Sequence, residues 1–473
     1  MNAALETLLV REGRRLQTPL WWVGGPVRDE ILKRPWLDGD LACTNALRVA
    51  QRLRRVLAAK LITLDDQYRI YRIILPTGGA TLDIAELQGK TIEADLARRD
   101  FSINAMARRV GHPEVLDPWN GRGDIRRKKI RALAKKTLED DPIRRLRAFR
   151  FSAQLGFAIV PQTLRWIRQG TLRGVAAERI REELLKLMAS LQSGSVLAAM
   201  DESGLLVGIF EELEACRRTA PAYYGKGGVL KHSLATVRNL EWLLAHRPVF
   251  TPAQWAECAR YLDEPVGGFP RRAWLKLGAL LHDIGKPATA QKIDGRLRFF
   301  GHEEVGADMV GPLAQRLRLS RQETQLIRQW VKQHMRLGGL AVASGAGVKA
   351  FARYFRDLDG RDGLGMILVS LADHYDYLSP KRWGKNTDPV EKTAKRMMDA
   401  YFSERSRLRP ARLINGHDVM KALRLPPSPE IGRILERVQD AQVEGKVTTR
   451  TEALAFLKRT VGSSPKRGPS RSA

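Results

Sequence analysis

Short apolar segments predict strands in the first 110 residues of the chain. Residues 21–23, 69–74 and 80–84 are rich in aromatic and β-branched side chains, which favour strands. Residues 45–57 instead carry apolar side chains at helical spacing between Leu47 and Val56, as expected for an amphipathic helix. This mixture predicts a domain with a small mixed sheet.

The remainder of the chain has a helical pattern. The fold class that we predict is therefore α+β: a head with a small mixed sheet, an all-α body and a second all-α domain. Breaks in the pattern divide the chain into five parts. These are a head (1–125), a helical neck or body (126–215), a second helical domain (216–385), a C-terminal helical unit (386–460) and a basic, disordered tail (461–473).

Composition narrows the class of protein. The 473 residues carry a net charge of +29 with a pI near 10.4, which predicts a polyanionic partner, either nucleic acid or an anionic membrane. The sequence contains no run approaching 18 apolar residues and no signal-peptide pattern, so we expect no membrane span and a cytoplasmic location. Three scattered cysteines argue against a disulfide framework or a thiolate zinc site.

A carboxylate pair is the first candidate for chemistry. Asp38 and Asp40 are two residues apart, so in a strand they share one face. Such a pair can hold Mg²⁺. The preceding Gly24-Gly25 turn can expose backbone N–H groups to a phosphate, and Arg28 adds a cation. A phosphate cradle beside paired carboxylates is what two-metal phosphoryl or nucleotidyl transfer requires.

Two further segments fit that chemistry. Asp83, in a predicted strand, is either a third carboxylate of the metal site or a solvated strand residue. A helix predicted to begin near Ser102 would bury Ile103 and Met106. It would gather polar residues at its N-terminal end, where arginine can neutralise a triphosphate and Asp or Asn can bond ribose hydroxyls. These residues are Arg98, Arg99, Asp100 and Asn104.

Asp141 and Arg144 form a candidate base-reading pair. Asp141 precedes Pro142, so it is also expected to cap a helix that begins with proline. The functional alternative uses the spacing of three, which puts Asp141 and Arg144 on one helix face. The carboxylate accepts and the guanidinium donates hydrogen bonds. Together they could read the edge of a nucleobase without a nucleic-acid template.

These motifs, in order, resemble those of class II tRNA nucleotidyltransferases and bacterial poly(A) polymerases, within the polymerase-β-like superfamily. The matching segments are GGPVRD (24–29), DGD (38–40), LARRDFSINAMA (96–107) and DDPIRRLRAFRF (140–151). The resemblance implies that an RNA 3′-hydroxyl attacks the α-phosphate of ATP or CTP. Asp38 and Asp40 would hold catalytic Mg²⁺, and Asp83 completes the predicted catalytic set. The implied nucleotide-binding residues are Gly24, Gly25, Arg28, Arg99, Asp100, Asn104, Asp141, Arg144 and Arg147.

Two departures from the family pattern bear on specificity. The base-reading motif usually begins Glu-Asp, whereas Asp140 precedes Asp141 here. About eleven residues separate Asp83 from Asp95, where many CCA-adding members carry a longer flexible loop that is needed for the switch to ATP. CCA addition to tRNA is the primary hypothesis. CC-only addition, A-only addition and poly(A) synthesis remain open, because they would share every motif.

Histidines in the second half indicate a second metal site. Imidazole and carboxylate ligands from several helices can hold one or two divalent metals, and the adjacent His282-Asp283 pair can place both ligands at one metal. Lys286 could hold a substrate phosphate. Residues 225–380 resemble the HD-domain metal-dependent phosphohydrolases, which act on phosphomonoesters or cyclic phosphodiesters. The implied ligands are His232, His282, Asp283 and Asp373, with His302 and His334 for a second metal.

The HD resemblance implies either Mg²⁺ or a transition metal such as Ni, Mn or Fe. An alternative from another class is an HD hydrolase whose N-terminal half only binds RNA. Between residues 126 and 151, eleven Lys or Arg oppose three acidic residues, so we expect this stretch and the tail to follow an RNA backbone. The predicted partners are tRNA, ATP and CTP, and the sequence leaves the oligomeric state open.

Overall fold

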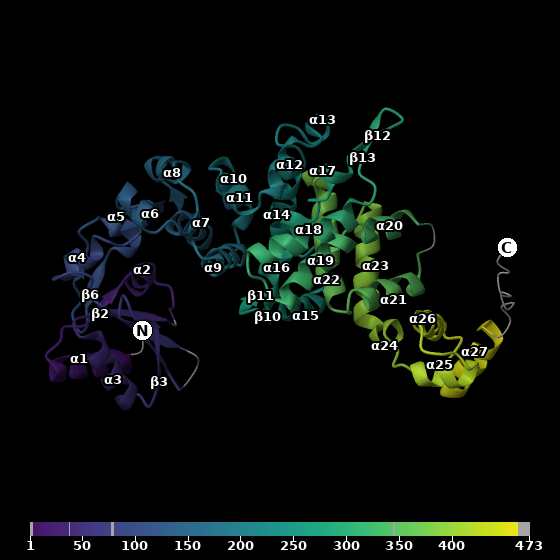
Figure 1. Cartoon of the computed structure of the whole chain (residues 1–473), viewed down its shortest axis with the longest axis horizontal. Helices are drawn as coiled ribbons and strands as arrows, with labels where there is room; N and C mark the ends of the chain where they lie inside the picture. Colours follow the sequence, from purple (N-terminus) through teal and green to yellow (C-terminus); the bar gives the residue numbers. More distant parts are fainter. Residues whose placement is uncertain (1–2, 37, 77–79, 344–345, 462–473) are drawn as a thin grey trace, which may run out of the picture. The chain divides into compact units, whose positions relative to one another are not determined.

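The chain forms two compact units, an N-terminal unit (residues 1–209) and a C-terminal unit (residues 210–473). The computed structural model describes residues 3–36, 38–76, 80–343 and 346–461 (Figure 1). Residues 462–473, which make up nearly all of the predicted basic tail, lie outside the described residues.

The N-terminal unit contains the predicted mixed sheet, which has seven strands in the order β3-β4-β5-β2-β1-β6-β7. Strands β2 and β5 are parallel and the other neighbours are antiparallel. The three predicted strands are confirmed as β1, β4 and β5. The strand bounds are β1 Trp21–Val23, β2 Gly39–Cys43, β3 Lys60–Asp65, β4 Ile70–Ile74, β5 Thr81–Glu86, β6 Ala107–Arg109 and β7 Val115–Leu116.

Helix α3 (Ala46–Val56) confirms the predicted amphipathic helix. It buries Ala46, Val49, Ala50 and Leu53 and contacts β4 and β5, so the apolar stripe faces the sheet. The other elements of this unit are α1 Ala3–Leu16, α2 Gly25–Ile31, α4 Ile92–Leu96, η1 Ser102–Asn104, α5 Gly121–Arg126, β8 Lys129–Ile130, α6 Lys135–Asp140, α7 Arg144–Leu155, β9 Ala158–Ile159, α8 Pro161–Arg168, α9 Ala177–Met188, α10 Ser193–Glu202 and α11 Leu205–Ile209.

Two local predictions in this unit are wrong. The helix expected from Ser102 is only the 3₁₀ turn η1, because the chain then enters β6 and pairs with β1. Ile103 and Met106 are nevertheless buried as expected. Asp141 does not cap a helix that begins at Pro142. Helix α7 begins at Arg144, and the Asp141 carboxylate binds an arginine of α9 instead.

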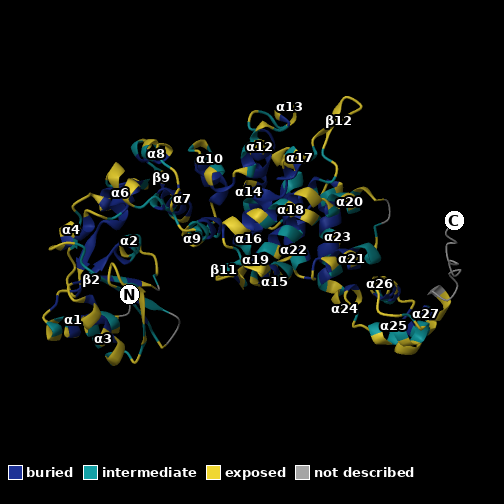
Figure 2. Ribbon diagram, viewed as in Figure 1, coloured by how far each residue is buried: buried dark blue, intermediate teal, exposed yellow. Residues whose placement is uncertain are grey.

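The C-terminal unit is helical, with two small hairpins. Long buried stretches of α14, α16 and α22 form its core (Figure 2). Its first elements are α12 Glu212–Arg218, α13 Pro221–Tyr224, α14 Gly228–His246, α15 Pro252–Asp263, β10 Pro265–Val266, β11 Phe269–Pro270, α16 Arg271–Leu281, α17 Lys286–Thr289, β12 Gln291–Ile293, β13 Arg296–Arg298, α18 His302–Arg316, α19 Arg321–Gln333, α20 Arg336–Val342, α21 Val348–Asp357 and α22 Asp362–Tyr375.

The last helices build a smaller core of their own. Ile414, Val419, Ile434 and Leu457 are among its buried residues. The elements from residue 380 onward are η2 Pro380–Arg382, α23 Pro389–Ser403, α24 Arg405–Leu408, α25 Gly416–Leu423, α26 Pro429–Val443 and α27 Arg450–Val461. Among the described helices, none combines the length and the apolar character that crossing a membrane requires. The observed architecture confirms the predicted α+β class.

Candidate functional site

A cavity of about 1060 Å³ in the N-terminal unit brings the predicted nucleotide-handling motifs together. Its lining contains residues from the glycine turn, the carboxylate pair, the arginine cluster and the base-reading segment. The predicted residues that line it are Gly24, Gly25, Arg28, Asp38, Asp40, Arg99, Asp100, Asn104, Asp141, Arg144 and Arg147. Segments more than 100 residues apart in the sequence therefore line one cavity.

The carboxylate pair lies at the start of β2. Asp40 is within the strand and Asp38 immediately precedes it, where Thr81 Oγ1 donates a 2.7 Å hydrogen bond to Asp38 Oδ1. Burial, with nearby Asp83 and Asp38, raises the pKa of Asp40 to about 6 against the opposing effect of Arg99 and Arg28. A carboxylate crowded in this way is stabilised by a bound cation, so the pair fits a divalent metal.

Asp83 lies beside Asp40, because the parallel register of β2 and β5 pairs their Cα atoms. Its carboxylate accepts two hydrogen bonds from Arg72, at 2.7 and 2.8 Å. Among the described residues, the cavity lining includes Asp38 and Asp40 but not Asp83. The third predicted carboxylate thus stands next to the pair with an arginine partner of its own.

The glycine turn packs closely against charged side chains. Gly24 has φ of +67°, a conformation that favours glycine. A Cβ at Gly24 would lie 2.8 Å from Arg99 Nη1, and one at Gly25 would lie 3.6 Å from Asp40 Oδ2. Arg99 is held by Asp95, with Nη2 to Oδ2 at 2.9 Å. The absence of side chains at Gly24 and Gly25 therefore leaves room for cations and carboxylates at the turn.

A chain of polar contacts connects the glycine turn to α7. Arg28 Nη1 donates to Asn104 Oδ1 at 2.8 Å, and Asn104 Nδ2 donates to Asp100 Oδ1 at 3.0 Å. The other Asp100 oxygen lies 3.2 Å from Arg147 Nη1. Burial opposes ionisation of Asp100, but Arg147, Asn104 and Arg144 outweigh it and lower its pKa. These residues hold each other in fixed, charged positions.

Asp141 and Arg144, the candidate base-reading pair, each have partners besides one another. Arg144 Nε lies 3.8 Å from Asp141 Oδ2, while Arg144 Nη1 donates to the backbone carbonyls of Arg98 and Thr137. Arg179 on α9 donates two hydrogen bonds to the Asp141 carboxylate, at 3.1 and 2.9 Å. Sequence reasoning missed Arg179. Its position 38 residues from Asp141 gave no local signal.

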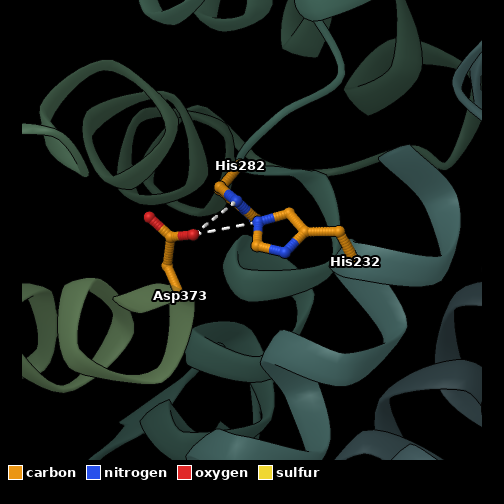
Figure 3. Close-up of side chains that lie close together, drawn as sticks. All are labelled: His232, His282 and Asp373. Carbon is orange, nitrogen blue, oxygen red and sulfur yellow. Dashed lines mark ion pairs between the residues drawn. The ribbon is translucent and has the colours of Figure 1, made fainter. Parts of the chain in front are cut away.

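Six residues predicted as HD ligands converge in the C-terminal unit. His232 lies on α14, His282 and Asp283 follow α16, and Asp373 lies near the end of α22. His232 and His282 point toward Asp373 (Figure 3), with Nε2 to Oδ1 distances of 2.9 and 3.7 Å. The remaining two, His302 and His334, complete the cluster from α18 and from the end of α19.

Asp283 stands between two pairs of histidines. Its Oδ2 lies 3.5 Å from His232 Nε2 and 3.2 Å from His282 Nε2. Its Oδ1 lies 3.2 Å from His302 Nε2 and 3.6 Å from His334 Nε2. One carboxylate can therefore contribute an oxygen to each of two neighbouring cations.

The histidine rings are oriented by their outer nitrogens. Nδ1 of His282, His302 and His334 each faces a backbone carbonyl at 2.7 to 2.8 Å, and His232 Nδ1 pairs with Asp376 Oδ2 at 2.7 Å. These contacts place a proton on Nδ1 and direct the Nε2 lone pairs inward. The sequence analysis did not identify Asp376 as a partner of the histidines, although its position three residues after Asp373 was a usable signal.

The cluster fits divalent metals by its donor set. Among the described residues, His232 Nε2, His282 Nε2 and Asp283 Oδ1 are buried with no hydrogen-bond partner. Buried polar atoms of this kind call for a partner. Two groups of candidate ligands have ligand atoms close enough to share an ion: His232 with His282 and Asp373, and His282 with Asp283 and His334. The chain thus carries candidate groups for divalent metals in both units.

Family models match most of the chain in separate segments. The description "Poly A polymerase head domain" matches residues 20–131, and "Probable RNA and SrmB- binding site of polymerase A" matches residues 156–217. "HD domain" matches residues 229–378, and domain 2 of tRNA nucleotidyltransferases matches residues 410–457. These matches define a nucleotidyltransferase that also contains an HD domain.

Full-length relatives identify the family. A CC-adding tRNA nucleotidyltransferase of Thermus thermophilus is 32% identical over 92% of each chain. An A-adding tRNA nucleotidyltransferase of Deinococcus radiodurans is 29% identical over 94% of this chain and 96% of that one. The crystal structure of the Bacillus stearothermophilus CCA-adding enzyme in complex with CTP has the same fold, with a TM-score of 0.64, 21% identity and 98% of each chain covered. The chain belongs to the tRNA nucleotidyltransferase family.

Proposed function

We propose that this chain adds nucleotides from CTP and ATP to tRNA 3′ ends without a template, by two-metal nucleotidyl transfer. One observation carries the proposal: the carboxylate pair, the glycine turn and the base-reading pair all line one cavity. Asp38 and Asp40 would hold Mg²⁺, which when bound neutralises charge on the triphosphate, and Asp83 would support them from the next strand.

Different residues of the cavity would bind the triphosphate, the sugar and the base. Gly24, Gly25, Arg28 and Arg99 would bind the triphosphate, and Asp100 and Asn104 would contact the sugar. The RNA 3′-hydroxyl oxygen bonds to the α-phosphorus while the bond to the β-phosphate oxygen breaks. Pyrophosphate leaves with that electron pair, and the hydroxyl proton is released. Asp141, Arg144 and Arg147 would orient the base, and the basic stretch 126–150 would follow the RNA backbone.

The test supplies purified protein with tRNA ending before CCA, after the first C, or after CC. Each substrate receives CTP or ATP separately, and products are resolved at single-nucleotide length. We expect CTP to extend the first two substrates. Long adenosine tracts on unrelated RNA would overturn the tRNA assignment.

A second candidate, CC-only addition, is favoured by the short connection between β5 and α4. Residues 87–91 form this link, and its first two residues are anchored by hydrogen bonds. Leu87 N donates to Cys43 O at 3.0 Å, and Gln88 N donates to Asp95 Oδ1 at 3.1 Å. A short, anchored link resembles that of members that add only CC, whereas many CCA-adding members carry a longer flexible loop in this interval. tRNA ending in CC should then gain nothing from ATP, and addition of one A would refute this candidate.

For the C-terminal unit we propose a phosphohydrolase with two divalent metals. Asp283 would bridge them, with His232, His282 and Asp373 on one side and His302 and His334 on the other. Mg²⁺, Mn²⁺, Ni²⁺ or Fe²⁺ suits this donor set. A water oxygen bonds to phosphorus as the ester P–O bond breaks, and the leaving alcohol takes a proton. Phosphomonoesters or cyclic phosphates at RNA 3′ ends are the proposed substrates.

Phosphatase assays with each metal test this activity, comparing the wild type with Asp283→Asn. Asp294→Asn serves as the matched control, because Asp294 is exposed on the β12–β13 turn. We expect activity in the wild type and the control alone, and equal rates in all three proteins would refute the site.

We also propose the five-part domain division with boundaries at residues 125, 215, 385 and 460.

A further inference from the structure

Three tyrosines pack against one another beside the histidine cluster in the C-terminal unit, and two of them contact His232. Tyr223 and Tyr224 end α13, and Tyr377 follows α22. The Tyr224 ring stacks on the His232 imidazole, with centroids 5.0 Å apart and planes 27° apart. The Tyr377 ring lies 5.3 Å from the same imidazole. We call Tyr223, Tyr224 and Tyr377 the tyrosine wall.

The inner part of the wall is fixed by hydrogen bonds. The Tyr224 hydroxyl accepts a 2.9 Å hydrogen bond from Lys286 Nζ and lies 3.2 Å from the Tyr377 hydroxyl. Lys286 also pairs with Asp283, the carboxylate at the centre of the cluster. A single network therefore ties the aromatic wall, a cation suited to phosphate and the metal-ligand candidates together.

The outer part of the wall is open to solvent. Tyr223 is 71% exposed and Tyr377 is 45% exposed. The Tyr223 ring meets Tyr224 at 88°, with centroids 4.7 Å apart, and lies 6.3 Å from the Tyr377 ring. Packing against Tyr224 holds Tyr223 in place while much of its ring stays uncovered. Exposed aromatic side chains combined with nearby positive charge are a usual platform on which nucleobases stack.

We infer that the tyrosine wall binds the base of the nucleotide whose phosphate lies at the His–Asp cluster. The HD site then selects nucleoside phosphates, free or at an RNA 3′ end, over phosphate esters that lack a base. Lys286 and the metals would engage the phosphate, and Tyr223 with Tyr377 would contact the base. This inference rests on the proposed phosphohydrolase activity.

The test compares hydrolysis of 2′,3′-cyclic AMP, 3′-AMP and glycerol 2-phosphate by the full chain. Base stacking is worth about 1–3 kcal/mol, so Tyr223→Ala should raise KM for both nucleotides about 5- to 150-fold. KM for glycerol 2-phosphate should not change. Tyr223→Phe should behave as the wild type, and Tyr223→Leu, which keeps bulk without an aromatic face, as the alanine variant. Phe300→Ala, at a residue 74% exposed on another turn, is the matched control.

Equal losses on nucleotides and glycerol 2-phosphate would overturn the inference, as would full nucleotide affinity in Tyr223→Ala. A short RNA with a 3′-phosphate, assayed beside 3′-AMP, shows whether the base comes from RNA or from a free nucleotide. If no substrate is hydrolysed, the proposed phosphohydrolase fails. Calorimetric binding of 3′-AMP then tests the wall separately, and it must weaken in Tyr223→Ala but not in Phe300→Ala for the inference to stand.

Discussion

Asp141→Asn is expected to relax the choice between CTP and UTP. The ionised carboxylate only accepts hydrogen bonds, which suits the exocyclic amine of cytosine and opposes the O4 acceptor of a uracil-type base. An asparagine side chain can donate to that O4. The substitution therefore removes a favourable contact with CTP and creates one with UTP.

The structure sets the size of this effect. A hydrogen bond to a charged group contributes about 1.5–3 kcal/mol, or roughly 10- to 150-fold. The Asp141–Arg179 pair must open first, and the Arg179 side chain is 52% exposed, so this opening costs only about 0.2–1 kcal/mol. We therefore expect the kcat/KM ratio of CTP to UTP to fall by about 10-fold or more.

The assay measures single-nucleotide incorporation into tRNA that lacks CCA, with CTP and UTP at several concentrations. Glu139→Gln is the matched control, because it removes one carboxylate charge at an exposed residue two positions away that does not line the cavity, and it should leave the ratio within about twofold. A ratio unchanged by Asp141→Asn in a correctly folded protein would refute the assignment of Asp141 as the base-reading carboxylate.

Three further predictions concern metal, acid and salt. Asp283→Asn should lose all HD-bound Mn²⁺, whereas Asp373→Asn should keep the ion at His302 and His334, as measured by elemental analysis. Equal Mn²⁺ contents in the two variants would contradict a bridging Asp283. Burial opposes ionisation of Asp124, but Arg131 and other hydrogen-bond donors outweigh it and lower its pKa, so its stabilisation is present above pH of about 4 and is lost as pH falls through the lowered pKa. Asp124→Asn should thus lower the denaturant midpoint at pH 7 and lower it much less at pH 3. An equal decrease of the midpoint at both pH values would contradict stabilisation by the ionised Asp124 carboxylate. Affinity for tRNA should fall at least about 10-fold between 50 and 200 mM salt, and a salt-independent Kd would contradict backbone binding.

The motifs that the sequence singled out line one cavity, but the contacts between their side chains had no signal in the sequence. Strand periodicity is local, so it predicts Asp38 and Asp40 on one face. In the structure Asp40 lies within β2 and Asp38 immediately precedes the strand. That they line one cavity with Asp141 depends on chain segments about 100 residues away. The helix expected at Ser102 failed because pairing between β6 and β1 overrides local preference.

Partners supplied from distant helices had no local signal. Arg179, which binds Asp141, comes from α9, and Tyr224, which stacks on His232, comes from α13. The histidine set could be predicted because ligand chemistry restricts it to a few residue types. That Asp283 faces two histidine pairs was settled only by how four helices converge.

The most direct test of nucleotidyl transfer is CTP incorporation by Asp40→Asn, measured under single-turnover conditions with pyrophosphate release as a second readout. Asp66→Asn is the matched control, since Asp66 is an exposed aspartate of the same unit. We predict that Asp40→Asn loses both incorporation and pyrophosphate release while the control matches the wild type. Incorporation that survives in Asp40→Asn would contradict the assignment of the Asp38–Asp40 pair as the metal-holding centre of the reaction.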